Sequence, residues 1–424
     1  MFIKSYYNMH LDVDRCPPEI LSVMNMNKTA VFSFTLLIIL VSQISLSFAS
    51  YTPTITIPSS GMVKEKVAEL ITIRKLIVAY GTWGDEYLEH IAKFDLVDLG
   101  FEVASKAVAL KTLNPNIFII AYKNTMAMYL NYEDWAEVNG HEDWFLHDVN
   151  GNRLINKDWG WYAMDVGNSG WRAHYANSAK AKLDAYPMVD GIFADDTWDM
   201  FWTDAWLNNA VPDPSIAPRW HNDMIGFLRY VKSVIGSKLL IPNTTDNADY
   251  VDVSDGKMQE GFTHTSWWGL DEFPTWYNWK EKIDALASLS SRGKYYLADS
   301  GAIIPESPTS EDLEKARKVM LYCVCSYLLG VSGPNASFGW NDIYSKDGSR
   351  GYYPEFDVSL GSSVNEYYSV GSVYARDFAG GKVLVNPTTS IYTVNLDGEY
   401  KTLDGQKVSN VTLDDHSGVI LLSL

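Results

Sequence analysis

The sequence predicts a (β/α)8 barrel followed by a small antiparallel β-sandwich. Two features between residues 75 and 342 support the barrel, namely eight short apolar runs of strand-like composition and the helical stretches that separate most of them. Strands that alternate with helices indicate a parallel sheet, and eight such units in roughly 270 residues fit a closed barrel. From about Gly361 helical periodicity is lost, and short alternating runs separated by GG, NP, DG and SG pairs predict the sandwich.

Each predicted strand is a short apolar run that stops at polar or small residues. KLIVAYG and IFIIAYKNT, for example, are rich in β-branched and aromatic side chains, which favour strands. The eight runs cover residues 75–81, 96–101, 117–125, 189–196, 238–243, 257–262, 294–301 and 336–342.

Helices are predicted where apolar residues recur along longer stretches between these runs. They cover residues 85–94, 102–114, 171–187, 220–236, 276–291 and 310–330. Cys323 and Cys325 lie one residue apart in the last helix, which is a poor spacing for zinc, so both are predicted to be buried small apolar side chains.

An open, doubly wound sheet is the alternative architecture for the same alternation. Sheets of that kind usually hold a nucleotide at a glycine-rich turn after a strand, and no such turn follows any of the eight runs. The barrel is therefore preferred. Its predicted bounds are residues 67–360, and those of the sandwich are residues 361–424.

The N-terminus has the pattern of a targeting segment. Lys28 precedes the apolar run TAVFSFTLLIILVSQISLSFAS, which is interrupted by polar residues, is short for a membrane span and ends in a small-residue cleavage site at Ala49. We expect residues 1–49 to be a secretory signal with an upstream extension, and residues 50–66 to be a linker. The alternative is an uncleaved membrane anchor. The expected location is extracellular, with no stable membrane insertion once the signal is cleaved.

Composition limits the classes of partner. The formal net charge is −18, which argues against nucleic acid because phosphate binding needs clustered Lys and Arg. The 15 Trp and 26 Tyr residues exceed what a core needs, and flat aromatic faces suit sugar rings, although they also suit protein partners.

Acidic residues lie at the ends of several predicted strands, where parallel barrels carry their functional groups. Asp195 and Asp196 end the run VDGIFADD, although aspartate disfavours strands and is rarely buried without a partner. Glu260 and Asp299 end two later runs. The other strand-end candidates are Tyr80, Trp83, Tyr122, Lys123, Asn243, Trp340 and Asp342.

Strand alternation suggests which aspartate faces the barrel interior. Ile192, Ala194 and Asp196 share one face, and Phe193 shares the other face with Asp195. Because small residues suit a crowded interior and Phe193 suits the helix layer, Asp196 is predicted to face inward, with Asp195 as the alternative.

Structural roles compete with each of these assignments. A strand-end Asp often caps the next helix, Glu260 could serve in an ion pair, and Asp299 precedes Ser-Gly and could form a turn. The acidic loop DVNGNR offers oxygen ligands for calcium, but without the full EF-hand spacing a turn is favoured. Asn243 also heads a pattern for N-linked glycans. H-E-x-x-H and G-x-S-x-G patterns are absent, which disfavours a zinc hydrolase and an α/β-hydrolase.

Three segments carry a resemblance to a known family: VDGIFADD, EDWFLHDVNGNRLIN (142–156) and MDVGNSGWR (164–172). They resemble the family of hypothetical glycosyl hydrolases numbered fifteen, which are (β/α)8 barrels grouped with α-galactosidase-like hydrolases. The tail GGKVLVNPTTSIYTVNL is similar to the small β-sandwich that closes many barrel glycosidases. The resemblance covers most of residues 70–424.

The resemblance implies that the fourth-strand acid, Asp196 or Asp195, is the nucleophile. It implies that the sixth-strand acid, Glu260, is the acid/base, although the related clan usually carries Asp at that position. The sequence therefore predicts a secreted glycoside hydrolase that acts on a carbohydrate and needs no organic cofactor or metal. Paired carboxyl groups are the chemistry that glycoside cleavage uses. The predicted substrate-binding residues are Tyr80, Trp83, Lys123, Trp198, Asn243, Trp267, Trp268 and Asp299.

Two other functions remain open. A non-catalytic carbohydrate-binding protein on a degenerate barrel would keep the aromatic residues without needing opposed carboxyl groups. A cell-surface structural or adhesion protein would use the apolar N-terminal segment as an anchor.

Overall fold

The structure is a computed structural model, and it describes residues 52–57, 73–157, 159–198, 210–244, 248–305, 307–342 and 351–424. The predicted signal, residues 1–49, lies outside the described residues. Within the described part of the chain, no helix has both the length and the apolar character needed to cross a membrane.

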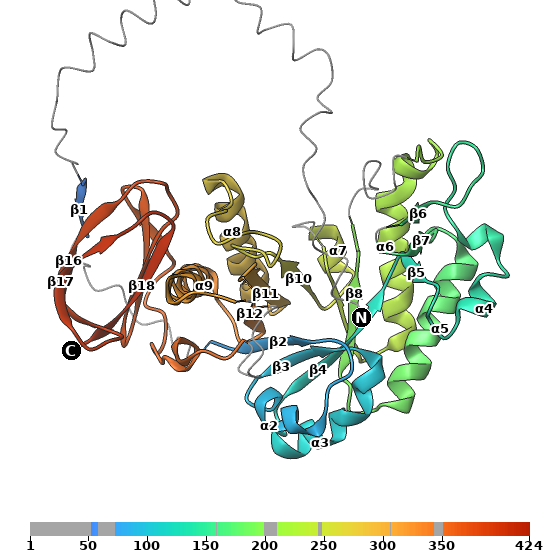
Figure 1. The fold of residues 1–424 in the computed structure, drawn as a ribbon, viewed down its shortest axis with the longest axis horizontal. Helices are drawn as coiled ribbons and strands as arrows, with labels where there is room; N and C mark the ends of the chain where they lie inside the picture. The colour runs from blue at the N-terminus through green and yellow to red at the C-terminus, as the bar shows by residue number, and fades with distance from the viewer. Residues whose placement is uncertain are drawn as a thin grey trace, which may run out of the picture. The chain divides into compact units, whose positions relative to one another are not determined.

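Eight parallel strands form the barrel, in an order around the sheet that follows the chain (Figure 1). The first and last strands of this path, β10 and β9, meet through a parallel bridge between Asn243 and Met258, which brings the two edges of the sheet together. All eight predicted runs are strands, so the barrel prediction is confirmed. Their bounds are β2 Lys75–Ala79, β3 Leu96–Leu99, β4 Phe118–Asn124, β8 Gly191–Asp195, β9 Leu239–Pro242, β10 Gly256–Glu260, β11 Tyr295–Ala302 and β12 Ala336–Asp342.

Helices connect these strands, and all six predicted helices are present. The last two have the predicted bounds, whereas the first two begin as 3-10 helices. Asn168 accepts hydrogen bonds from two backbone N–H groups at the start of α5, and Thr309 forms a capping box at the start of α9. The helices are α2 Leu88–Ile91, α3 Ala107–Leu113, α4 Trp135–Val138, α5 Ser169–Ala185, α6 Ile216–Ile235, α7 Ala248–Asp252, α8 Trp276–Ser291 and α9 Ser310–Gly330, with 3-10 helices η2 Asp85–Tyr87, η3 Phe101–Lys106, η4 Glu142–Trp144 and η6 Pro354–Asp357.

A small three-stranded sheet lies between β4 and α5 and was not predicted. Its strands are only two or three residues long, too short to show a period-two pattern. The adjoining loop DVNGNR is a turn, because Asp148 Oδ1 accepts hydrogen bonds from the backbone N–H groups of Asn150 and Asn152, both at 2.8 Å. The strands are β5 Ala127–Tyr129, β6 Ile155–Asn156 and β7 Trp161–Ala163.

The barrel interior is filled by large side chains. The predicted orientation of β8 is therefore wrong, since Phe193 points into the barrel and Ile192 and Ala194 pack in the helix layer. Bulky branched and aromatic residues commonly fill the layers inside such barrels, so size did not identify the inward face. The interior cluster consists of Leu76, Leu96, Ile120, Phe193, Ile241, Met258 and Leu297, with Val78, Phe118, Tyr122, Leu239 and Tyr295 beside it.

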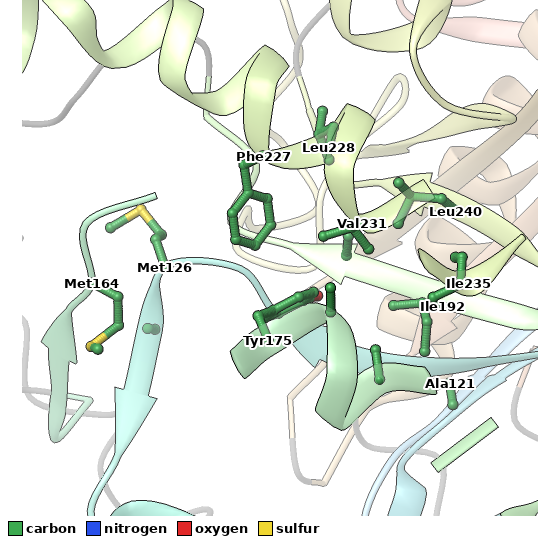
Figure 2. Packing of buried hydrophobic residues seen from close by; sticks show 14 of the residues in the cluster. Ala121, Met126, Met164, Tyr175, Ile192, Phe227, Leu228, Val231, Ile235 and Leu240 are labelled. Atoms are coloured by element: carbon green, nitrogen blue, oxygen red, sulfur yellow. The ribbon is translucent and has the colours of Figure 1, made fainter. Parts of the chain in front are cut away.

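The outer core packs the helices against the strands. Figure 2 shows Tyr175 of α5 beneath Phe227 of α6, and their ring centroids are 4.9 Å apart. Ile192 of β8 lies beside Ile235 and Leu240 in the same view, which shows its outward orientation.

The C-terminal domain is one curved sheet that encloses a core of its own. β16 pairs with β17 over its first half and with both β17 and β18 near its end, with a register shift between Asn395 and Tyr400, and the sheet folds around buried residues such as Val373 and Leu384. Part of the predicted linker belongs to this sheet, because β1, Thr54–Thr56, pairs with β16 in parallel. The other strands are β13 Tyr368–Val370, β14 Val373–Phe378, β15 Gly381–Asn386, β16 Tyr392–Thr402, β17 Lys407–Leu413 and β18 Ser417–Ser423.

Helix α9 packs against both the barrel and the C-terminal sheet. Tyr322, Cys323 and Cys325 are fully buried in a cluster that also holds Val383 and Ile420 of the C-terminal sheet. Both thiols are free, and burial raises their pKa, that of Cys323 to about 12. The prediction that both cysteines are buried is confirmed.

Candidate active site

The mouth of the barrel, where the carboxyl ends of the strands lie, is lined by polar residues at regular positions. Along each strand, side chains alternate between the interior and the helix layer. A residue two positions after an interior residue therefore also faces inward. The interior residues nearest the mouth are Val78, Leu96, Ile120, Phe193, Ile241, Met258 and Leu297. The residues two positions after them, which line the mouth, are Tyr80, Asp98, Tyr122, Asp195, Asn243, Glu260 and Asp299.

Asn243 joins two of the carboxyl groups. Its Nδ2 donates to Asp195 Oδ1 at 3.0 Å and to Glu260 Oε2 at 2.8 Å. Because both oxygens contact the same nitrogen, they can be no more than roughly 6 Å apart. This upper limit lies below the roughly 6.5–9.5 Å of inverting glycosidases and includes the about 5–5.5 Å of retaining ones. The engaged amide also argues against a glycan on Asn243.

The side chain of Glu260 is accessible to solvent, yet its carboxyl group is largely desolvated by surrounding protein atoms. This desolvation raises the pKa of Glu260, and the nearby Asp195 raises it further, while hydrogen bonds from Asn243 and Trp267 lower it. The indole Nε1 of Trp267 donates to Glu260 Oε1 at 3.4 Å. Glu260 is therefore suited to hold a proton, as a general acid must.

Asp196 lies just beyond the end of β8 with a left-handed backbone, at φ 51°. Its Oδ2 accepts a hydrogen bond from Asn124 Nδ2 at 2.6 Å. Burial raises the pKa of Asp196, and Asp195 raises it further. Asp195 and Asp196 thus both lie at the mouth, but Asp195 is the one that Asn243 connects to Glu260.

Asp98 of β3 is a site residue that the sequence reasoning missed. Its side chain is completely buried, its Oδ2 accepts a hydrogen bond of 2.5 Å from the Tyr80 hydroxyl, and its Oδ1 has no partner among the described residues. Burial raises the pKa of Asp98, and Asp195 and Asp299 raise it further. A charged residue inside the apolar run LVDLGF was the available signal.

Asp299 of β11 lies beside Glu260 of β10, since the two residues are register partners. Both of its oxygens accept long hydrogen bonds, 3.2 Å each, from Asn341 Nδ2. Burial raises the pKa of Asp299, and Glu260 raises it further. Asp98, Asp195, Asp196, Glu260 and Asp299 are called the mouth acids below.

Aromatic residues flank the mouth acids. Tyr80 and Trp267 are each 45% exposed, and the Tyr80 ring meets that of Tyr122 edge to face at a centroid distance of 5.1 Å. Trp198 hydrogen-bonds Asp196 and so lowers its pKa. Trp268 lies against the buried ring of His264, 5.7 Å away.

Three of the sequence candidates lie elsewhere. Lys123 follows the inward Tyr122 and so faces the helix layer. Its Nζ contacts Ser178 and the ring of Tyr175 there, and burial lowers its pKa to about 8. Trp83 donates to the carbonyl of Ala79 and stacks with Lys106, and Trp340 is buried in the helix layer.

Metal ligation has no candidate group at this mouth. Within the described residues, no three or more His, Cys, Asp or Glu side chains are arranged so that they could hold a metal ion. The mouth instead has two carboxyl groups, those of Asp195 and Glu260, which Asn243 connects and which lie beside aromatic side chains. Most glycosidases use a pair of carboxyl groups for cleavage.

Many glycoside hydrolases are (β/α)8 barrels with a pair of carboxyl groups at the carboxyl ends of the strands. Residues 111–382, more than half of the chain, match the family described as hypothetical glycosyl hydrolase family 15. The chain belongs to that family. None of the curated proteins compared with it matches.

Solved structures share the fold at low sequence identity. A maltogenic alpha-amylase, AmyB from Thermotoga neapolitana, is 13% identical and has a TM-score of 0.50, with 82% of this chain and 98% of that chain covered. The glycoside hydrolase domain of PelA from Pseudomonas aeruginosa is 16% identical, with a TM-score of 0.44 and coverage of 68% and 98%. Aspergillus fumigatus Ega3, in complex with galactosamine, is 10% identical, with a TM-score of 0.42 and coverage of 69% and 98%. Likenesses at these identities show the fold alone.

Proposed function

We propose that this chain is a glycoside hydrolase in which Asp195 is the nucleophile and Glu260 the general acid/base. The observation that carries the proposal is the Asn243 side chain, which contacts both carboxyl groups and keeps their oxygens within roughly 6 Å. At that separation Asp195 can attack the anomeric carbon while Glu260 protonates the leaving oxygen. Water then hydrolyses the glycosyl–Asp195 ester with Glu260 as base, and the anomeric configuration is retained.

The assignment differs from the sequence prediction, which favoured Asp196. Asp195 shares the inward face with Phe193, whereas Asp196 lies past the strand and is held by Asn124. Asp196 would instead stabilise charge beside the nucleophile.

The test is sugar release from a panel of oligo- and polysaccharides, using the chain from Ser50 onward. Asp195→Asn and Glu260→Gln are expected to lower kcat at least ~10³-fold, within the ~10²–10⁴-fold that positioned acid–base groups supply. Asp196→Asn is the matched neighbour and is expected to lose less than Asp195→Asn. The reverse order would overturn the assignment of the nucleophile.

Two further readouts separate the roles. Glu260→Gln should keep most of its activity on an aryl glycoside whose leaving group needs no protonation, whereas Asp195→Asn should not. The first product should have the anomeric configuration of the substrate by NMR. Saturable sugar binding without any cleavage would favour the non-catalytic carbohydrate-binding alternative.

Secretion belongs to the same proposal. The apolar segment before Ala49 and its small-residue end support a cleaved signal. Protein recovered from culture medium should begin near Ser50, and a cell-bound chain that keeps the segment would contradict the proposal.

A further inference from the structure

The acidic residues at the two ends of β8 and β10 differ in whether a basic side chain pairs with them. At the amino end of β8, Asp190 pairs with Lys111 at 2.8 Å, and at the amino end of β10, Asp255 pairs with Lys232 at 2.7 Å. At the carboxyl ends of these strands lie Asp195 and Glu260. Among the described residues, no Lys, Arg or His side chain forms an ion pair with any mouth acid.

The mouth acids therefore act mainly on one another. Besides burial, the charges that raise the pKa of Asp196, Glu260 and Asp299 belong to neighbouring carboxyl groups. Lys123, near the carboxyl end of β4, faces the helix layer. A ligand that brought a positive charge to the mouth would relieve this repulsion.

Two more observations point to a cation in the same place. Asp98 Oδ1 is buried at the mouth without a hydrogen-bond partner, and Asp299 accepts only long bonds from Asn341. Tyr80 and Trp267, which bond Asp98 and Glu260, are 45% exposed, and the exposed faces of such rings attract cations.

We propose that the site takes a sugar with a protonated amino group, as in a polysaccharide that has lost its N-acetyl groups, and that Asp299 accepts hydrogen bonds from the ammonium. The inference rests on the proposed function, since it names the substrate class of the same site. An ammonium offers three donors and needs acceptors on several sides. Glu260 is the register partner of Asp299, and the charge of Asp299 also acts on Asp98.

The experiment compares matched sugars. Oligosaccharides of glucosamine and of galactosamine are each offered with free amines and with N-acetyl groups, together with their neutral hydroxyl counterparts, and kcat/KM is measured for each. The free-amine form is expected to be preferred at least ~10-fold in one of the two series, the size of one charge-assisted contact. Asp299→Asn should lower that preference ratio by a similar factor.

Asp85→Asn is the control for overall charge. It removes the same charge from an exposed side chain that pairs with Lys106 and should leave the preference ratio unchanged. If it lowers the ratio as much as Asp299→Asn, general attraction explains the preference and the inference fails. The wild-type ratio alone is also decisive, because preference for the neutral or N-acetylated sugar overturns the inference even if Asp299→Asn does not fold.

Failure of the two proposals is distinguishable. Cleavage of neutral or acetylated sugars in preference to amino sugars leaves the hydrolase proposal standing and overturns this one. Calorimetric binding of the amino sugar without cleavage, lost in Asp299→Asn, supports this inference and overturns the hydrolase. If amino sugars are neither bound nor cleaved, the amino-sugar inference is overturned. Displacement of the amino sugar by Ca²⁺ at equal concentration also overturns it, because the mouth would then be a metal site.

Discussion

Asp98 is the most deeply buried of the mouth acids, and burial raises its pKa. Between the ordinary aspartate pKa of about 3.9 and the raised value, the folded chain holds a proton that the unfolded chain has released. Stability therefore falls as pH rises through this range. Asp98 thus costs the fold stability near neutral pH, a pattern typical of functional sites.

Asp98→Asn tests this cost. The amide keeps an acceptor for the Tyr80 hydroxyl but does not ionise. The unfolding free energy of the variant should therefore increase relative to that of the wild type as pH rises from 3 to 8. The measurement is urea unfolding across that range. Asp213→Asn should show the opposite trend, because hydrogen bonds from Ser215 lower the pKa of Asp213, and the stability they add is lost as pH falls. A difference for Asp98→Asn that does not vary with pH would refute the prediction.

Asn243 should control the pH dependence of the reaction. Its hydrogen bond lowers the pKa of Glu260 against the larger effect of burial. Asn243→Ala should therefore raise that pKa and move the basic limb of the kcat/KM profile to higher pH, since the limb follows loss of the Glu260 proton. Asn341→Ala removes an amide that bonds Asp299 instead and should move the limb less. Lower activity with an unshifted limb would show that Asn243 acts in another way.

At the scale of elements, the eight strands and six of the helices could be predicted because their apolar runs are long enough to show a period, whereas the short helices α4 and α7 could not. The sheet β5–β7 could not, since two or three residues carry no pattern. The orientation of β8 failed for another reason. Size separates interior from helix layer poorly where the interior holds residues such as Phe193 and Met258.

The same alternation explains which site residues were found. Asn243, Glu260 and Asp299 stand at strand ends on the inward face, so position alone identified them. Lys123 stands at a strand end on the outward face, and position alone misassigned it. Asp98 was missed although it shares the inward face with Leu96, because the predicted run 96–101 extends beyond the true end of β3 and placed Asp98 inside the strand.

Strand β18 and helix α9 approach so closely that one position between them tolerates only glycine. A Cβ atom on Gly418 would lie 2.6 Å from Cys325 Cβ and 2.9 Å from its Sγ. Gly418→Ala should therefore lower the unfolding free energy by about 1–3 kcal/mol, the usual cost of overpacking, as measured by urea unfolding. Gly398→Ala, in the same sheet, is the control, because its Cβ would have Tyr400 as its nearest neighbour at 3.9 Å. Equal effects of the two substitutions would rule out this contact as the cause.

At the scale of the whole molecule, one buried arginine ties the C-terminal sheet to the barrel. Arg376 of β14 donates from Nη1 to the carbonyls of Leu328, Leu329 and Val331 at the end of α9, at 3.0, 2.9 and 2.6 Å. Burial lowers its pKa to about 10, so it stays charged at neutral pH. A cation at the carboxyl end of a helix is favourable and satisfies carbonyls that the helix leaves free.

Arg376→Ala should lower the unfolding free energy by at least about 3 kcal/mol, because it leaves several buried carbonyls without a donor. Arg292→Ala is the comparison. Arg292 forms an exposed pair with Asp252, so its loss should cost only about 0.2–1 kcal/mol. Similar losses for the two variants would mean that Arg376 does not tie the sheet to the barrel.

The same interface predicts that the barrel needs the C-terminal sheet to fold. Helix α9 buries Tyr322 and Cys325 in a cluster that includes Val383, Val385 and Ile420, so a chain ending at residue 360 would expose this apolar face to water. Exposed patches of that kind drive aggregation. The truncated chain is expected in the insoluble fraction under conditions where the full chain from Ser50 is soluble, and the sheet supplied as residues 361–424 should increase its recovery. A soluble truncated barrel with a cooperative unfolding transition would instead make the C-terminal sheet a separate module, and a sugar-binding role of its own would then be the next one to test.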